Sequence, residues 1–225
     1  ISNVKFSIGS RFTMFDVGTH GSELRLDAII GSDDLIAAEY YRPLDGKNFF
    51  VAPRAYFWTS SVDLFQNGDR VAEYRERKVA TGIDFGYTFN RNSQVRVGYE
   101  VGRDEARLQI GAPLLPKGEG LLSVGNLQFV YEGHNNAMVP TRGASLNAQA
   151  RWYFAAPGSD EPFPQAEIRG SALRPLSDKA SLFTYGSAGT TFSHTAAPLE
   201  QFTLGGPFRL GAFGTKEFRG DHYAL

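Results

Sequence analysis

The chain has 225 residues, no cysteine, 25 glycines, 18 phenylalanines and a formal net charge of -1. The lack of cysteine excludes a disulfide scaffold, a thiol nucleophile and cysteine-ligated metals. The near-neutral charge gives no electrostatic footprint for nucleic acid. No apolar run approaches the roughly 18 residues of a membrane-spanning helix, and no basic-then-apolar leader opens the sequence. Composition leaves a soluble protein and a transmembrane β-barrel open, because barrel strands alternate apolar with polar residues.

Alternation with a period of two predicts short strands in the first part of the chain. The strands cover about residues 4–14, 24–30 and 35–41, with turns at 18–21, 31–34 and 42–46. A longer strand starts near residue 49 and reaches a hairpin signal at 66–69. Its partner, about 73–89, has the clearest two-sided pattern: Val79, Thr81, Ile83, Phe85, Tyr87 and Phe89 on one face, and Lys78, Ala80, Gly82, Asp84 and Gly86 on the other.

The same pattern continues to the last quarter of the chain. It predicts strands at about 95–101, 126–132, 144–154, 166–172 and 180–192, with loops at 111–120 and 157–162. All connections are of the hairpin type and no helix is predicted. We therefore expect an all-β, antiparallel barrel of about ten to twelve strands. Residues 1–193 would form up-and-down strands, and residues 194–225 a glycine-rich loop and the start of the next strand, within one domain.

The direction of the apolar face separates two fold classes. In a soluble barrel or sandwich it points inward, and in a membrane barrel outward. Some polar faces mix glycine with charges of both signs, which suits a crowded wet lumen. Aromatic residues also gather at strand ends, as membrane-interface girdles require: Phe49 with Phe50, Tyr87 with Phe89, and Trp152 with Tyr153 and Phe154. Both features favour a membrane barrel, although alternation alone supports both classes equally.

A glycine-rich segment at residues 204–213 ends the predicted strands. Three glycines and a proline exclude a long helix and break a strand, while phenylalanine and leucine supply apolar anchors. Such a loop needs a surface to pack on, and a barrel lumen would supply one.

The motifs resemble a known group of barrels. The spacing of Gly205-Gly206 from Gly211-Ala212-Phe213 resembles the sixth extracellular loop of BamA, TamA and the two-partner-secretion transporters. In those sixteen-stranded outer-membrane barrels this loop folds into the lumen. Residues 139–143, Val-Pro-Thr-Arg-Gly, resemble their periplasmic turn, which a strand follows.

A fuller resemblance is to the barrel attached to bacterial patatin-like phospholipases. It rests on Gly18, Glu23-Leu24-Arg25, Gly31 and the run from Glu39 to Leu44, and on the loop sequence at 202–213. Two departures matter. Gly211 stands where the assembly factors have the loop arginine, which Arg209 or Arg219 could replace. The chain also matches only part of the family barrel, so we expect a fragment, because unpaired strand edges in lipid would leave backbone groups unsatisfied.

Enzyme chemistry has little support in the sequence. The four histidines are scattered without metal-ligand spacing. Residues 185–189, Tyr-Gly-Ser-Ala-Gly, lack the first glycine of a nucleophile elbow and precede no helix. The tripeptide Arg219-Gly220-Asp221 is interpreted as a chance match to a cell-adhesion motif. We therefore predict no catalytic residue, no metal and no cofactor; any lipase would lie outside this chain.

Two groups of residues are candidates for function. The loop motif comprises Gly205, Gly206, Arg209, Gly211, Phe213, Arg219 and Gly220. The lumen wall comprises Arg25, Asp27, Glu39, Arg54, Lys78, Asp84, Arg96, Glu100, Arg151, Glu167 and Arg169. The wall charges either brace the barrel against the loop or line a path for an unfolded chain, and bracing is favoured because opposite charges on neighbouring strands pair.

The resemblance implies a bacterial outer-membrane barrel that transports or inserts polypeptide, or anchors an N-terminal patatin-like lipase. Its expected partners are outer-membrane lipid and a polypeptide substrate or fused passenger, with a homodimer as a further option and no nucleic acid. The alternatives are a soluble β-barrel that binds an apolar ligand and a passive porin.

Overall fold

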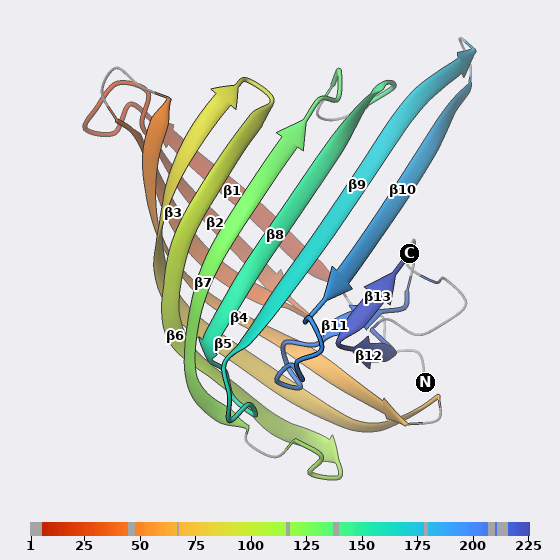
Figure 1. Cartoon of the computed structure of the whole chain (residues 1–225). Helices are drawn as coiled ribbons and strands as arrows, with labels where there is room; N and C mark the ends of the chain where they lie inside the picture. Colours follow the sequence, from red (N-terminus) through yellow and green to blue (C-terminus); the bar gives the residue numbers. More distant parts are fainter. Residues whose placement is uncertain are drawn as a thin grey trace.

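The computed structural model describes residues 6–44, 48–66, 68–115, 118–136, 140–177, 180–206, 210 and 216–225. Ten long strands follow one another along the chain, joined by turns and loops (Figure 1). They are β1 (Ser7–Phe15), β2 (Glu23–Gly31), β3 (Asp34–Pro43), β4 (Phe49–Gln66), β5 (Asp69–Asn90), β6 (Ser93–Gly111), β7 (Glu119–Glu132), β8 (Gly143–Ala155), β9 (Phe163–Ser177) and β10 (Ala180–Thr190).

These strands pair antiparallel in chain order, and the short β13 (His222–Ala224) adds to β10, which gives one sheet of eleven strands. The sheet is strongly curved, and a separate hairpin of β11 (Phe202–Leu204) and β12 (Phe218–Gly220) lies near its C-terminal strands (Figure 1). The described part of the chain contains no helix with the length and apolarity to cross a membrane. The all-β antiparallel fold predicted from alternation is confirmed.

The strand register carries each side-chain face across the whole sheet. One row of paired residues runs Glu39, Arg54, Gly82, Glu100, Val124, Tyr153 and Phe163. Another runs Phe49, Tyr87, Val95, Phe129, Ala148, Ile168 and Ala188. Since side chains alternate along every strand, these rows belong to opposite faces, which are called the inner and outer face below.

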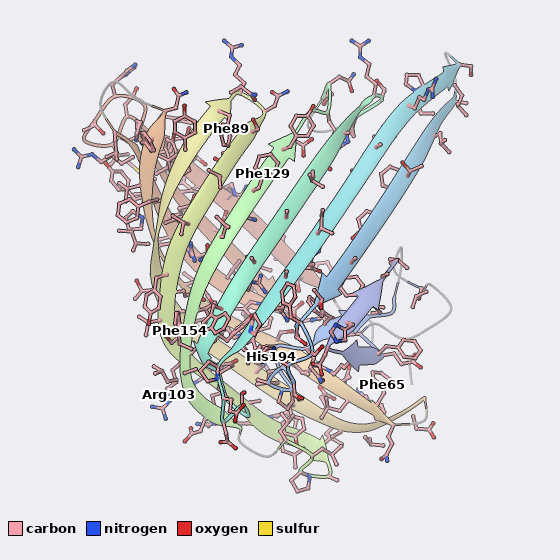
Figure 2. The ribbon with its side chains drawn as sticks, in the orientation of Figure 1. Phe65, Phe89, Arg103, Phe129, Phe154 and His194 are labelled. Carbon is pink, nitrogen blue, oxygen red and sulfur yellow. The ribbon has the colours of Figure 1, made fainter. Side chains whose placement is uncertain are left out.

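The outer face is apolar and exposed. Phe85, Val97 and Phe154 are 53%, 58% and 54% exposed. The inner face holds the buried charges, including Asp84 and Asp104, and the chain after β10 packs on it. Figure 2 labels three residues along the sheet, Phe89, Phe129 and Phe154. A soluble barrel with an apolar interior, the alternative left open by the sequence, is therefore wrong.

The prediction of an interface girdle is wrong for two aromatic residues, Phe50 and Tyr153. Phe50 and Tyr153 are 0% and 2% exposed and lie on the inner face, so they do not belong to an outer girdle. The reason is geometric, because neighbours in a strand point to opposite faces. Phe49 and Trp152, their direct neighbours, are the ones on the outer face, at 47% and 46% exposed.

Several strands are longer than their alternation indicates. β5, β6 and β7 reach beyond the predicted spans, and β4 and β5 have 18 and 22 residues. The strand expected after the Pro-Thr-Arg-Gly turn is present as β8, and Asn135 closes that turn by accepting from the backbone N–H groups of Thr141 and Arg142 at 3.0 and 3.1 Å. Val139, part of the same motif, lies outside the described residues.

Candidate functional site

The eleven residues predicted as a wall lie on seven strands, β2 to β6, β8 and β9. Strand pairing places all of them on the inner face: Arg25, Asp27, Glu39, Arg54, Lys78, Asp84, Arg96, Glu100, Arg151, Glu167 and Arg169. They fall into two groups, one on β2 to β6 and one on β8 and β9, with Lys78 apart from the first group along β5.

The first group forms a continuous charge ladder. Arg11 on β1 binds Asp27 on β2 at 2.6 Å, and Arg25 on β2 binds Glu39 on β3. Glu39 also meets Arg96 of β6 at 3.3 Å, across the two intervening strands. Contact between strands this far apart requires a sheet that is tightly curved toward the inner face.

Arg54 is the centre of this ladder. Its guanidinium binds Asp84 on β5 and Glu100 on β6, the latter at 3.1 Å, and the Tyr56 hydroxyl donates to Glu100 at 2.7 Å. The carboxylates are largely desolvated, with side chains 5% and 15% exposed. A planar guanidinium can serve two carboxylates at once, so Arg54 ties three strands together.

An aromatic residue fills the inner face beside the ladder. The Phe50 ring lies under the Arg96 guanidinium, 5.1 Å from its centroid. It also covers Gly86 so closely that a methyl group added there would overlap the ring. Glycine at this position therefore makes the space that Phe50 occupies.

The second group, on β8 and β9, is more open. Arg151 donates to Gln149 at 2.8 Å, and Arg169 pairs with Glu167 at 2.6 Å. The Arg169 side chain remains 50% exposed. A polar cavity of about 180 Å³ lies here, between β8, β9 and the residues after β10.

The chain turns back onto the inner face directly after β10. Phe192 and Ser193 have φ values of 52° and 69°, which residues other than glycine rarely adopt. The turn is closed by the His194 N–H, which donates to the Thr191 carbonyl at 3.1 Å, and Thr191 itself is fully buried. Residues 194–204, called the inner loop below, then follow the sheet (Figure 2 labels His194).

One carboxylate, that of Glu200, anchors the inner loop to two separate strands of the sheet, β5 and β8. Glu200 accepts from the Lys78 ammonium of β5 and from the Tyr153 hydroxyl of β8, both at 2.8 Å. Gln165 of β9 donates to its carbonyl at 2.8 Å. Burial alone would raise the pKa of Glu200, but the Lys78 charge and the hydrogen bonds from Lys78 and Tyr153 outweigh it, so the pKa is lowered.

Lys78 is a shared counter-charge. Glu76 and Asp104 lie 3.4 Å from its ammonium, in addition to Glu200 at 2.8 Å. Asp104 is fully buried and Glu76 is 4% exposed. Three carboxylates therefore surround one ammonium group, and the inner loop supplies one of them, Glu200.

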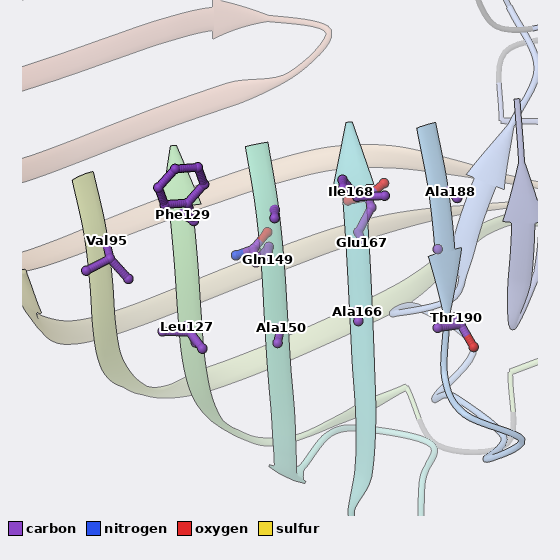
Figure 3. Close-up of a pocket in the computed structure, with 12 residues that line it drawn as sticks. Val95, Leu127, Phe129, Gln149, Ala150, Ala166, Glu167, Ile168, Ala188 and Thr190 are labelled. Atoms are coloured by element: carbon purple, nitrogen blue, oxygen red, sulfur yellow. The ribbon is translucent and has the colours of Figure 1, made fainter. Parts of the chain in front are cut away.

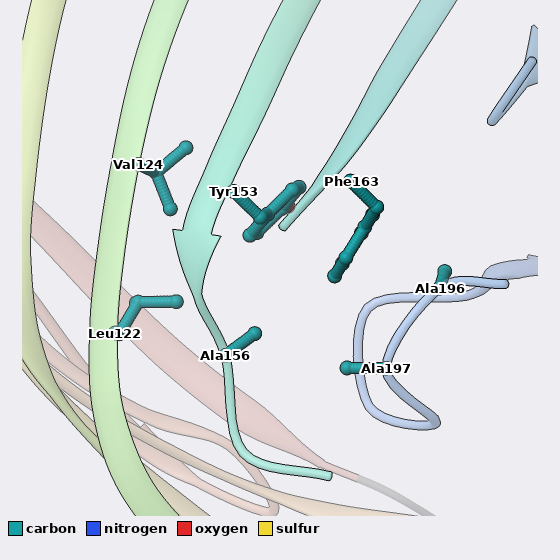
Figure 4. Packing of buried hydrophobic residues seen from close by; sticks show 7 residues of the cluster. All are labelled: Leu122, Val124, Tyr153, Ala156, Phe163, Ala196 and Ala197. Carbon is teal, nitrogen blue, oxygen red and sulfur yellow. The ribbon is translucent and has the colours of Figure 1, made fainter. Parts of the chain in front are cut away.

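Apolar packing supports the anchor. Ala196 and Ala197 of the inner loop bury against Leu122, Val124, Tyr153, Ala156 and Phe163 (Figure 4), and the Tyr153 and Phe163 rings stack at 4.6 Å. Leu199 packs on a second cluster made by Val62, Ala72, Tyr74 and Ala106. The loop thus covers apolar inner-face residues that would otherwise meet water.

The predicted loop motif is partly described. Gly205 and Gly206 are buried, with φ values of 116° and 97° that favour glycine. Gly220 pairs with Phe202 between β12 and β11. Arg219 donates to the Pro198 carbonyl at 3.0 Å, and burial lowers its pKa. Arg219 therefore binds the backbone of the inner loop. Arg209, Gly211 and Phe213 lie outside the described residues.

Sequence reasoning missed the most connected residue of the site. Glu200 follows Pro198 in a segment without alternation, and no spacing marks it as a partner of Lys78. Glu76 and Asp104 lie in or beyond predicted strands but were not selected. The sequence held a signal for Asp104. This residue shares the inner face of its strand with Gly102 and Ala106, and a charged residue there is expected to pair with an opposite charge on a neighbouring strand.

Among the described residues there is no group of three histidine, aspartate or glutamate side chains that could hold a metal. An apolar hollow of about 480 Å³ lies on the outer face, where Val95, Leu127 and Phe129 stand beside alanines of β8, β9 and β10 (Figure 3). It is open, and its outward side chains are apolar apart from Thr190, whose hydroxyl contacts a His222 ring nitrogen at 2.9 Å.

Comparisons with known proteins agree with this architecture. No curated protein matches the sequence. The fold is similar to a crystal structure of BamA from Haemophilus ducreyi lacking POTRA domains 1-3, with a TM-score of 0.71 and 15% sequence identity. The match covers 93% of this chain and 43% of the BamA chain, so the chain spans less than half of that protein. The family model of the Omp85 superfamily domain matches residues 20–223. The chain therefore belongs to the Omp85 superfamily.

Proposed function

We propose that this chain is a membrane-integral part of a bacterial outer-membrane barrel that inserts or translocates polypeptide. The observation that carries the membrane assignment is the outer apolar band. On β5 it extends from Val79 to Phe89 and is followed by Arg77 at one end and Arg91 at the other. The ten residue-to-residue steps from Val79 to Phe89, at about 3.4 Å each and tilted by about 40°, span about 25 Å, which is the height of the lipid-facing band of such barrels.

The inner face supports the polypeptide assignment. The charge ladder occupies β1 to β6 and is mutually paired, so we assign it to bracing. The wall of β8 and β9 keeps a polar, partly exposed surface at Asn147, Gln149 and Arg169, which suits contact with an extended chain. A polypeptide edge could then add to the sheet through main-chain hydrogen bonds.

The inner loop argues against a passive porin. A porin keeps an aqueous channel, whereas here Glu200, Ala196 and Ala197 are packed against the wall. Transport through this space would require the loop to move.

The membrane assignment is tested by single-cysteine labelling on β9, since the chain has no cysteine. Arg169 points inward and Ile168 outward, and in the structure they are similarly exposed, at 50% of the side chain and 47% of the residue. In lipid vesicles, a membrane-impermeant thiol reagent should label Arg169→Cys, while Ile168→Cys should react only after detergent is added. Equal labelling of both positions in vesicles contradicts the assignment.

The polypeptide assignment is tested by photo-crosslinking. A benzophenone amino acid at position 169, in protein reconstituted in vesicles, should crosslink to an unfolded outer-membrane polypeptide in transit, and the same group at 168 should crosslink to lipid only. Crosslinks to polypeptide at neither position would contradict it.

A lipase passenger is the finer alternative, and the motif of residues 18–44 favours it. Under this proposal the polypeptide handled by the barrel is the protein's own N-terminal domain. The full-length protein should then hydrolyse phospholipid, and the activity should reside in a domain that precedes this chain. Full-length protein that carries no such domain would refute the alternative.

A further inference from the structure

A row of outward-facing arginines borders the apolar band at the end of the sheet where the inner loop lies. It consists of Arg75 and Arg77 on β5 and Arg103 and Arg107 on β6, called the arginine cluster below. Arg75 pairs in register with Arg107, and Arg103 pairs with Val79, the last apolar residue of the band on β5. Arg103 is labelled at this border in Figure 2.

The cluster stands directly on apolar surface. Phe57 and Val79 form a register pair beneath Arg77, and both Val79 and Leu121 pair with Arg103. The Arg77 guanidinium lies 5.8 Å from the centroid of the Phe57 ring. Val79 and Leu121 are 49% and 59% exposed. Cationic groups and exposed apolar side chains therefore adjoin without a gap.

The charges of the cluster are only partly offset. Arg75 binds Asp34 at 2.8 Å and the Ser32 carbonyl at 3.0 Å. Arg107 pairs with Glu105, and Arg103 lies 3.5 Å from Glu119. The side chains of Arg103 and Arg107 both remain 71% exposed.

Two features leave room for an anion. Arg77 is exposed and takes part in none of the ion pairs among the described residues. Glu105, which lies opposite it in the register, binds Arg107 instead. Four arginines face three carboxylates, and Arg75 and Arg107 are directly opposite each other, an arrangement that is unfavourable for like charges. The next arginine along this face, Arg70, is already paired with two carboxylates of its own, at 3.1 and 3.3 Å.

We infer that the arginine cluster binds the phosphate group of a membrane lipid whose acyl chains lie on the apolar band below it. Guanidinium groups bind phosphate through paired, charge-assisted hydrogen bonds. Arg75 is directed toward Asp34 and Ser32, on the β3 side, so Arg77 and Arg107 are the guanidiniums left to bind an anion, which would offset the positive charge that the carboxylates leave uncompensated. The adjoining apolar surface selects a lipid phosphate over inorganic phosphate. The inference rests on the proposed membrane location.

The test uses the purified chain in non-ionic detergent and three probes: dioctanoyl phosphatidate, dioctanoylglycerol with the same chains, and inorganic phosphate. Calorimetric titration should show phosphatidate binding at least tenfold tighter than either other probe. The double variant Arg77→Gln/Arg107→Gln should weaken phosphatidate binding about tenfold, equivalent to about 1.4 kcal/mol, and leave dioctanoylglycerol unchanged. Arg91→Gln, at an exposed arginine in the turn that follows the opposite end of β5, is the matched control and should change nothing.

Each outcome decides the question. Unchanged phosphatidate binding in the double variant overturns the inference, and so does inorganic phosphate that binds as tightly as phosphatidate. If circular dichroism shows that the double variant does not fold, Arg77→Lys/Arg107→Lys keeps the charge: binding within threefold of the parent supports the cluster, and the same affinity for phosphatidate and dioctanoylglycerol refutes it. If Ile168→Cys is shielded in vesicles but the double variant binds phosphatidate like the parent, only this inference is refuted. If Ile168→Cys is labelled in vesicles, the proposed membrane location is refuted as well.

Discussion

Replacing Glu200 should release the inner loop from the sheet. Its carboxylate accepts two hydrogen bonds of 2.8 Å from different strands, one of them from an ammonium, and its side chain is 10% exposed. Removing one partner of a buried ion pair costs about 3 to 5 kcal/mol. Two other carboxylates remain 3.4 Å from Lys78, so we expect the lower end, about 3 kcal/mol, for Glu200→Ala. Glu200→Gln retains the shape and should cost about 1.5 kcal/mol.

Loop opening can be measured at Ala197, which is 1% exposed and packed on the wall. With Ala197→Cys as the parent, the thiol reacts only when the loop opens, so its labelling rate follows the opening equilibrium. Adding Glu200→Ala should raise the rate on the order of 100-fold, and Glu200→Gln about tenfold. Glu161→Gln, an exposed carboxylate in the β8–β9 loop, is the control. Equal rates for parent and Glu200→Ala, with folding intact by circular dichroism, would show that the anchor does not hold the loop.

Three further predictions concern pH and the inner wall. The pKa of Glu200 is lowered below the ordinary 4.5, so the ionised carboxylate stabilises the docked loop fully above pH 4.5, and this stabilisation is lost as the pH falls through the folded pKa. Labelling of the Ala197→Cys thiol by an acid-tolerant disulfide reagent should therefore accelerate in acid. Glu200→Gln should flatten this acceleration. Arg54→Met should destabilise the fold by about 3 kcal/mol or more in denaturant titrations, because two desolvated carboxylates lose their cation; a loss below about 1 kcal/mol would refute the bracing role. Gly86→Ala should cost about 1 to 3 kcal/mol by overpacking, while Gly186→Ala, where a methyl group meets only ordinary contacts, should be near neutral in the same titrations.

The strands and their faces were predictable because the alternation is local. Val79 to Phe89 assigns one face of β5 without knowledge of any partner, and antiparallel pairing then transmits that face to the neighbours. The ends of β6 and β7 were not predictable by this means. At the end of β6 both faces carry polar residues, as at Arg103, Asp104 and Glu105, and at the start of β7 both faces carry apolar residues, Leu121 outward and Leu122 inward. The period-two signal therefore fades although the backbone ladder continues.

The contacts of the site depended on curvature, which alternation does not encode. The wall residues could be selected by parity, but the pairing of Glu39 with Arg96 across two strands arises from the bending of the sheet. The anchor was hidden for a further reason. Glu200 lies 122 residues from Lys78 in an aperiodic segment, and only the turn at Phe192 and Ser193 brings the two together.

The positions of the register irregularities bear on how such a sheet can change over evolution. They occur at Leu64/Phe65, Glu73/Tyr74, Thr88/Asn90, Ser123/Val124 and Ala180/Ser181, all near strand ends. Between these irregularities, successive side chains of a strand alternate between the outer and the inner face. One inserted residue would therefore move every following side chain to the opposite face. Insertions and deletions of odd length should therefore accumulate at the rims, where a bulge restores the frame, and only even-length changes should survive in the middle of a strand.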